Sequence, residues 1–91
     1  MQTRIHLKIF GRVQGVCFRY YCVEAAGRHG VKGWVRNNPD GSVEVVAEGE
    51  DEDVRNFAAM CRRGPPGAYV RSCVENSESP TGEFESFLIG S

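Results

Sequence analysis

The apolar periodicity of this chain changes across Gly11–Arg19, and this change constrains the fold more than any other feature. Before it, residues 5–9 alternate between apolar and polar, the period-2 pattern of a half-buried strand. After it, apolar side chains recur with helical spacing over Phe18–His29, and Gly30 is typical of a residue that ends a helix. The sequence therefore predicts a strand that runs through a glycine-containing turn directly into a helix.

This turn is a candidate anion site. Bent backbone leaves N–H groups without partners, and they point the same way as the positive end of the following helix. Arg19, in the first helical turn, adds a planar and permanently charged guanidinium. The pattern indicates a site of the size and charge that suit a phosphate group.

Further strand and helix patterns follow along the chain. We predict strands over Val31–Asn37 and Ser42–Gly49, joined by the hairpin-turn sequence Asn38–Gly41. A second helix is expected with the acidic residues Glu50–Asp53 at its N-terminus, because carboxylates are favourable there. The glycines and prolines of Gly64–Gly67 end this helix.

Two last strands are expected over Ala68–Glu75 and Phe84–Ile89. The order β-α-β-β-α-β predicts an α+β fold of the ferredoxin-like type, with an antiparallel sheet, both helices on one face and a short fifth strand at the C-terminus. We expect residues 1–91 to form one domain, because a chain of this length supports a single core. Such a fold says little about function.

The composition is that of a soluble globular protein, with 41% hydrophobic and 25% charged residues. No apolar run approaches the roughly 20 residues that span a bilayer. The N-terminus alternates polar and apolar residues, unlike the continuous apolar segment of a signal peptide. We therefore expect a cytoplasmic protein without a membrane partner, and a monomer because no coiled-coil pattern is present.

Charge is unevenly distributed. Residues 1–40 carry seven lysines and arginines and two carboxylates, a net charge of +5; residues 41–91 carry four and ten, a net charge of −6. The positive half contains the glycine turn, so it would attract a small anion there. The same net charges are also explained if these side chains are simply solvated on the protein surface and attract no particular ligand.

The cysteines do not have metal-site spacing. No pair forms a CxxC, and His6 and His29 stand far apart, which disfavours zinc. We interpret three cysteines as small buried hydrophobic residues: Cys22, Cys61 and Cys73.

Cys17 lies on the glycine turn, two residues before Arg19. Cysteine phosphatases need five residues between the cysteine and the arginine, so this spacing does not fit their chemistry. Cys17 is either a passive thiol or one that the adjacent positive charge makes sensitive to oxidation.

Two segments make the chain recognisable. Gly11–Arg19 reads GRVQGVCFR and resembles the first signature of the acylphosphatases, G-x-V-Q-G-V-x-F-R. Gly33–Glu44 reads GWVRNNPDGSVE and resembles the second, G-W-V-x-N-x-x-D-G-x-V-E. Gly64–Pro66, followed by Ala68 and Val70, resembles the third recurring element of the family.

The resemblance implies a metal-free and cofactor-free hydrolase that cleaves the carboxyl-phosphate bond of acyl phosphates. It implies that Arg19 binds the phosphate and that Asn37 positions the attacking water. Backbone N–H groups of the turn complete the phosphate site, which comprises Gln14, Gly15, Val16, Cys17, Phe18 and Arg19. Because an acyl phosphate has a good leaving group, positioning and charge stabilisation suffice for its hydrolysis.

Other prominent residues have structural interpretations. Phe18, Trp34 and Phe57 are interpreted as packing residues rather than substrate-stacking ones. Asp40 and Glu44 are interpreted as a turn residue and a solvated strand residue rather than as acid–base catalysts.

The same order of strands and helices also occurs in proteins with two other functions. An RNA-recognition motif needs aromatic side chains on its central strands, whereas Ser42–Gly49 has none and carries Glu44 and Glu48. We therefore expect no nucleic-acid partner. The alternative is a catalytically silent phosphate- or partner-binding module, as in the phosphate-handling domain of hydrogenase-maturation factors. That domain continues from F-R into a proline, whereas Tyr20 and Tyr21 follow here, so we favour a free-standing enzyme.

Overall fold

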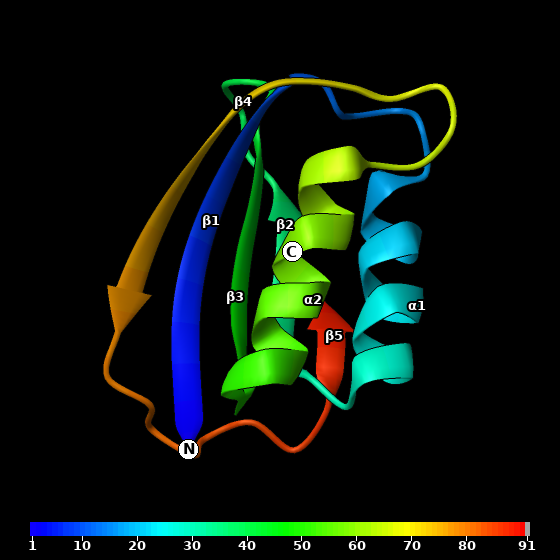
Figure 1. Ribbon diagram of the computed structural model, residues 1–91. Coiled ribbons are helices and arrows are strands. Elements are labelled where there is room, and N and C mark those ends of the chain that lie inside the picture. Colours follow the sequence, from blue (N-terminus) through cyan, green and yellow to red (C-terminus); the bar gives the residue numbers. More distant parts are fainter. Residues whose placement is uncertain (91) are drawn as a thin grey trace.

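Strands and helices follow one another in the predicted order in the computed structural model, which describes residues 1–90 (Figure 1). The strands are β1 (Gln2–Arg12), β2 (Lys32–Asn37), β3 (Val43–Glu50), β4 (Tyr69–Glu78) and β5 (Phe87–Ile89). The helices are α1 (Phe18–His29) and α2 (Asp51–Arg63). Neither helix of this part of the chain is long and apolar enough to cross a membrane.

The strands form one sheet in the order β4-β1-β3-β2-β5. The predicted antiparallel arrangement is confirmed for the four longer strands. β5 instead pairs in parallel with β2, from Gly33 opposite Phe87 to Val35 opposite Ile89. After β4 the chain crosses the end of the sheet near the N-terminus, so β5 starts at the end where β2 also starts (Figure 1). The sheet is therefore mixed.

Both helices cover the same face of the sheet, as predicted (Figure 1). Alternate residues of the central strands face them and are buried, because successive strand side chains point to opposite faces. Phe18 and Phe57, which the sequence analysis assigned to packing, are buried in this core. Trp34 is half-buried, and the guanidinium of Arg36 lies 5.0 Å from its ring centroid. The strand residues of the core include Ile5, Leu7, Ile9, Val35, Val43, Val45 and Ala47.

The last two strands differ in length from the prediction. β4 extends to Glu78 rather than Glu75, because its pairing with β1 continues as far as Arg4 opposite Glu78. β5 contains only Phe87–Ile89, whereas the sequence predicted a strand from Phe84. The preceding segment is held by side-chain contacts instead of by strand pairing.

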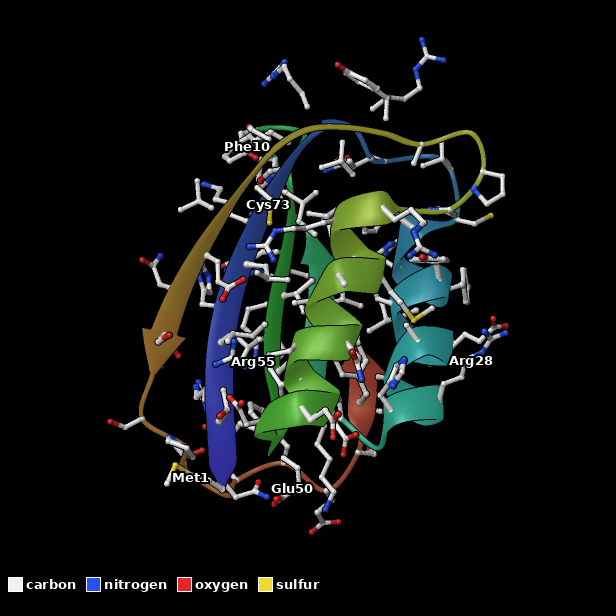
Figure 2. All side chains as sticks on the ribbon, in the orientation of Figure 1. Met1, Phe10, Arg28, Glu50, Arg55 and Cys73 are labelled. Atoms are coloured by element: carbon white, nitrogen blue, oxygen red, sulfur yellow. The ribbon has the colours of Figure 1, made fainter. Side chains whose placement is uncertain are left out.

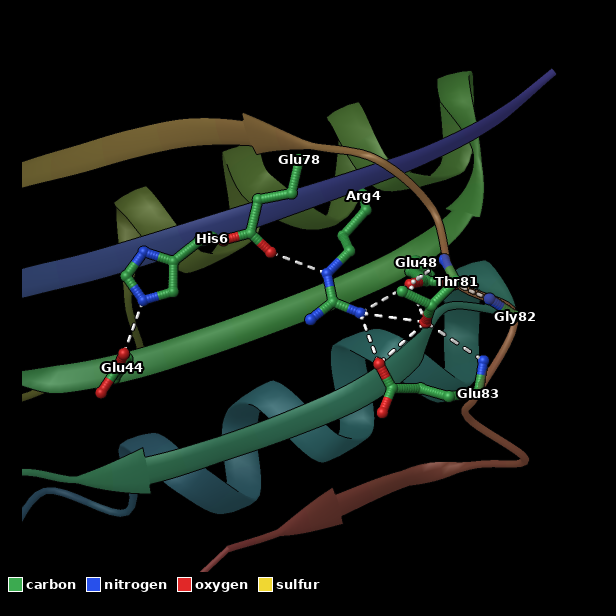
Figure 3. Close-up of polar contacts among 8 residues, drawn as sticks. All are labelled: Arg4, His6, Glu44, Glu48, Glu78, Thr81, Gly82 and Glu83. Carbon is green, nitrogen blue, oxygen red and sulfur yellow. Dashed lines mark hydrogen bonds and ion pairs between the residues drawn. The ribbon is translucent and has the colours of Figure 1, made fainter.

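Glu48 makes those contacts (Figure 3). Its carboxylate is buried and accepts hydrogen bonds from the backbone N–H groups of Thr81 and Gly82, at 3.0 Å each. The Arg4 guanidinium donates to it at 2.8 Å and also donates to Glu78 at 2.7 Å. Burial favours the neutral form of Glu48, but these hydrogen bonds outweigh burial and lower its pKa to about 2. The charged carboxylate therefore anchors the segment before β5.

The four cysteines are free thiols. Cys22 of α1 and Cys61 of α2 are buried, with their sulfur atoms 3.9 Å apart, which confirms the structural interpretation of these two. Cys73 is only half-buried, because β4 is an edge strand (Figure 2). Cys17 is exposed.

Candidate functional site

The loop between β1 and α1, residues 13–17 and hereafter the site loop, contains two residues in the left-handed conformation. Gly15 has φ 75°, and a Cβ placed there would meet no atom within 4 Å. Cys17 has φ 61° and is the one non-glycine residue with positive φ in the part of the chain that the structure describes. A side chain in this region is strained, and such strain concentrates at functional sites. The two residues turn the chain sharply from the strand into the helix.

This turn leaves a run of backbone N–H groups without partners. None of the N–H groups of Gln14–Arg19 donates a hydrogen bond to another residue between 1 and 90; the first one bonded in α1 is that of Tyr21, to the Cys17 carbonyl at 3.1 Å. α1 also has no capping side chain and no acidic residue in its first turn, whereas α2 begins with Asp51, Glu52 and Asp53. The positive end of α1 is therefore uncompensated and suits an anion.

Arg19 and Asn37 come together beside this turn. Arg19 extends from the first turn of α1, and Asn37 is the last residue of β2. Both side chains are half-buried, and within residues 1–90 neither forms a hydrogen bond or ion pair. They line one cavity of about 250 Å³, hereafter the site cavity, together with Val13, Gly15, Cys17, Phe18 and Tyr20. A guanidinium and an amide thus face the same space from two separate elements.

The other residues predicted for this site are placed differently. Gly15, Cys17 and Phe18 line the site cavity, but Gln14 and Val16 do not. Phe18 is buried, so its backbone rather than its ring is available to a ligand.

The Gln14 side chain has a role that the sequence analysis missed. Its amide nitrogen donates to the carbonyl oxygens of Asn38 and Ser42, at 2.9 Å each. These bonds join the site loop to the turn that follows Asn37, and Gln14 is half-buried between them. The periodicity of the sequence does not predict such a contact. The one sequence signal for Gln14 was that the first acylphosphatase signature has a glutamine at this position.

The turn after Asn37 is itself closely hydrogen bonded. The Asp40 carboxylate accepts from the hydroxyl and the N–H of Ser42, at 2.6 and 2.9 Å, and pairs with Lys8 at 3.2 Å. These contacts, led by the Ser42 hydroxyl, lower the pKa of Asp40 to about 2. Asp40 is therefore a turn residue, as predicted, and it holds the end of β2 in place.

One hollow of larger volume has its charged side chains already paired with one another. A cavity of about 470 Å³ lies between β1, β4 and α2. Carboxylates on its lining are engaged in ion pairs: Arg4–Glu78, Arg55–Asp51 and Arg62–Glu75. Among the described residues, no three histidine, cysteine or acidic side chains are grouped to hold a metal ion.

Comparison with known proteins agrees with the resemblance. The family model for acylphosphatase matches residues 5–89. An acylphosphatase of Methylococcus capsulatus is 48% identical over 86 residues, which cover 94% of this chain and 94% of that protein. The crystal structure of acylphosphatase from Bacillus subtilis has a TM-score of 0.94 at 31% identity and 100% coverage of both chains. Full-length HypF in its phosphate- and nucleotide-bound form also matches, with a TM-score of 0.90 at 27% identity, but over only 12% of that longer chain. The chain therefore belongs to the acylphosphatase family.

Proposed function

We propose that Arg19 and the backbone N–H groups of Gln14–Arg19 bind the phosphate of an acyl phosphate, and that Asn37 positions the water that attacks it. As a member of its family, the chain is an enzyme that hydrolyses acyl phosphates. The observation that carries the division of roles is the placement of Arg19 and Asn37 on one cavity, with neither side chain engaged by another residue between 1 and 90.

Phosphate binding follows from charge and geometry. The unpartnered N–H groups and the positive end of α1 face an anion, and the Arg19 guanidinium donates two parallel hydrogen bonds to its oxygens. In the transition state negative charge spreads over the equatorial phosphoryl oxygens, so these donors stabilise it more than the ground state.

Attack by water on this substrate requires a correctly positioned water molecule rather than a strong base. The Asn37 side-chain carbonyl accepts a hydrogen bond from the water and holds its oxygen in line with the bond to be broken. As the water oxygen bonds to phosphorus, the acyl oxygen leaves with the electron pair as a carboxylate. A phosphate oxygen of the substrate takes the proton of the water. The products are a carboxylate and inorganic phosphate.

This chemistry needs neither a general acid nor a metal, because a carboxylate leaves without being protonated. We accordingly propose a metal-independent and cofactor-free enzyme. We also propose that it is a cytoplasmic monomer of a single domain, acting on a small molecule without a nucleic-acid or membrane partner.

Hydrolysis of benzoyl phosphate in the presence of EDTA tests the proposal. Arg19→Ala should lose turnover by at least about 10²-fold, the effect of removing one oxyanion donor, and should also weaken inorganic phosphate binding. Asn37→Ala should lose turnover but still bind phosphate. Arg28→Ala is the matched control, because Arg28 lies exposed on the same helix and pairs with Glu24.

Each other outcome rejects a defined part of the proposal. Equal loss of phosphate binding in Arg19→Ala and Asn37→Ala would refute the division of roles. A requirement for added metal after EDTA treatment would refute metal independence. A folded wild type that binds phosphate without turnover would point to a silent binding module.

A further inference from the structure

A second cavity adjoins the site loop. It has a volume of about 470 Å³ and is hereafter the arginine cavity; its lining residues are Gly11, Arg12, Gly67, Ala68, Tyr69 and Arg71. Gly11 and Arg12 end β1, and Val13, the next residue, lines the site cavity. The arginine cavity therefore begins where the site loop begins.

A β-bulge brings two arginines to this cavity. In the ladder of β1 and β4, Phe10 lies opposite Ser72 but Gly11 lies opposite Val70, so Arg71 has no partner of its own. At this bulge the backbone of β4 lies close to Gly11, and only a glycine leaves enough room. The φ of Gly11 is 130°, and a Cβ there would lie 2.2 Å from the carbonyl oxygen of Tyr69. Bulges commonly redirect side chains beside active sites. Here the irregularity places Arg71 on the same cavity as Arg12.

The two guanidinium groups are free to bind. Arg12 and Arg71 are exposed, and neither forms an ion pair with any residue from 1 to 90. Arg4, Lys8 and Arg62 of the neighbouring strands and helix contact carboxylates, whereas Arg12 and Arg71 do not. No acidic residue lines the arginine cavity. Two arginines that line one hollow and have no ion-pair partner suit a carboxylate or a phosphate.

We propose that Arg12 and Arg71 form a specificity subsite for a second anionic group, carried by the acyl part of the substrate. The inference rests on the proposed function, because it takes the reacting phosphate to lie in the site cavity. It selects a substrate class: acyl phosphates whose acyl chain bears its own negative charge, such as monophosphorylated dicarboxylic acids.

Succinyl phosphate and butyryl phosphate provide the test, since they differ in having a terminal carboxylate or a methyl group. We expect the wild type to prefer succinyl phosphate in kcat/KM at about 0.15 M salt, where longer-range attraction is screened. The double variant Arg12→Gln/Arg71→Gln should lose at least tenfold of this preference through a higher KM for succinyl phosphate. Its kcat/KM for butyryl phosphate should not change. Arg63→Gln is the control, because it removes an exposed charge from the end of α2, outside the cavity.

The outcomes separate the two proposals. A wild type that hydrolyses butyryl phosphate without preferring succinyl phosphate overturns the subsite and leaves the proposed function intact. Equal losses for both substrates, or the same loss of preference in Arg63→Gln, also overturn it, because general electrostatic attraction would then be the cause. A folded wild type that hydrolyses neither substrate overturns both proposals.

Discussion

The side-chain amide of Gln14 donates a 2.9 Å hydrogen bond to the carbonyl oxygen of Ser42, twenty-eight residues further along the chain. A second bond from the same nitrogen reaches the Asn38 carbonyl. Gln14 belongs to the site loop, and Asn38 directly follows Asn37. One side chain thus fixes the phosphate-binding segment relative to the residue that is proposed to hold the water.

Gln14→Ala should therefore impair catalysis as well as stability. Loss of two such hydrogen bonds should reduce the free energy of unfolding by roughly 1–3 kcal/mol. Because Asn37 would no longer be fixed relative to the phosphate, kcat should fall by about tenfold or more while phosphate affinity changes less. Steady-state kinetics with benzoyl phosphate and urea unfolding measure both effects.

Asn38→Ala is the control for this prediction. The Asn38 side chain donates to the Ser42 hydroxyl at 3.0 Å within the turn and forms no hydrogen bond with the site loop. It should lose stability with little change in kcat. If both variants lose kcat in proportion to stability, Gln14 has a structural role only.

Cys17 provides a second prediction, because its exposed thiol lines the site cavity. Alkylation of the native protein with iodoacetamide should label Cys17 before the buried Cys22 and Cys61, and the added group should block activity. Inorganic phosphate should slow the labelling, and Cys17→Ser should stay active after the same treatment. Peptide mass spectrometry and residual activity report the result. If activity is unchanged when Cys17 is fully labelled, the Cys17 thiol is passive.

Local patterns in the sequence were sufficient to predict the elements that position the site. The strand–turn–helix of Gly11–Arg19 and the hairpin after Asn37 depend on neighbouring residues, so periodicity and turn chemistry indicate them directly. The family resemblance then selected Arg19 and Asn37, which the fold brings to one cavity.

Contacts between distant residues were not predictable in this way. The Gln14 bonds, the bulge opposite Gly11 and the Arg4–Glu48 pair link residues that are far apart in sequence. Each depends on strand register, which is set by packing of the whole sheet. The parallel pairing of β5 with β2 also joins segments that are far apart in sequence, and it was not predicted.

Two glycines of the first signature should respond differently to substitution. Gly15→Ala places a Cβ in open space, so only the left-handed φ is penalised, at about 1–2 kcal/mol. Gly11→Ala adds steric overlap with the Tyr69 carbonyl and the Arg71 N–H, both backbone atoms of the ladder. Its total cost should exceed about 3 kcal/mol. Urea midpoints measure the difference, and equal costs would show that the bulge adjusts without strain.

Acid should destabilise the protein through Glu48. Its pKa is about 2 in the folded protein, against an ordinary value of 4.5. The carboxylate therefore contributes its full stabilisation above pH 4.5 and loses it as the pH falls toward 2. At 1.36 kcal/mol for each unit of pKa shift, this contribution is about 3 kcal/mol.

Glu48→Gln isolates this contribution, because glutamine cannot change its charge. The variant should be less stable than the wild type at pH 6, and the difference should shrink as the pH falls from 4.5 to 2. Glu52→Gln is the control, since Glu52 is exposed and forms no ion pair among residues 1–90. Urea unfolding across this range measures all three proteins. A stability difference between wild type and Glu48→Gln that stays constant with pH would mean that the Glu48 charge does not anchor the segment before β5.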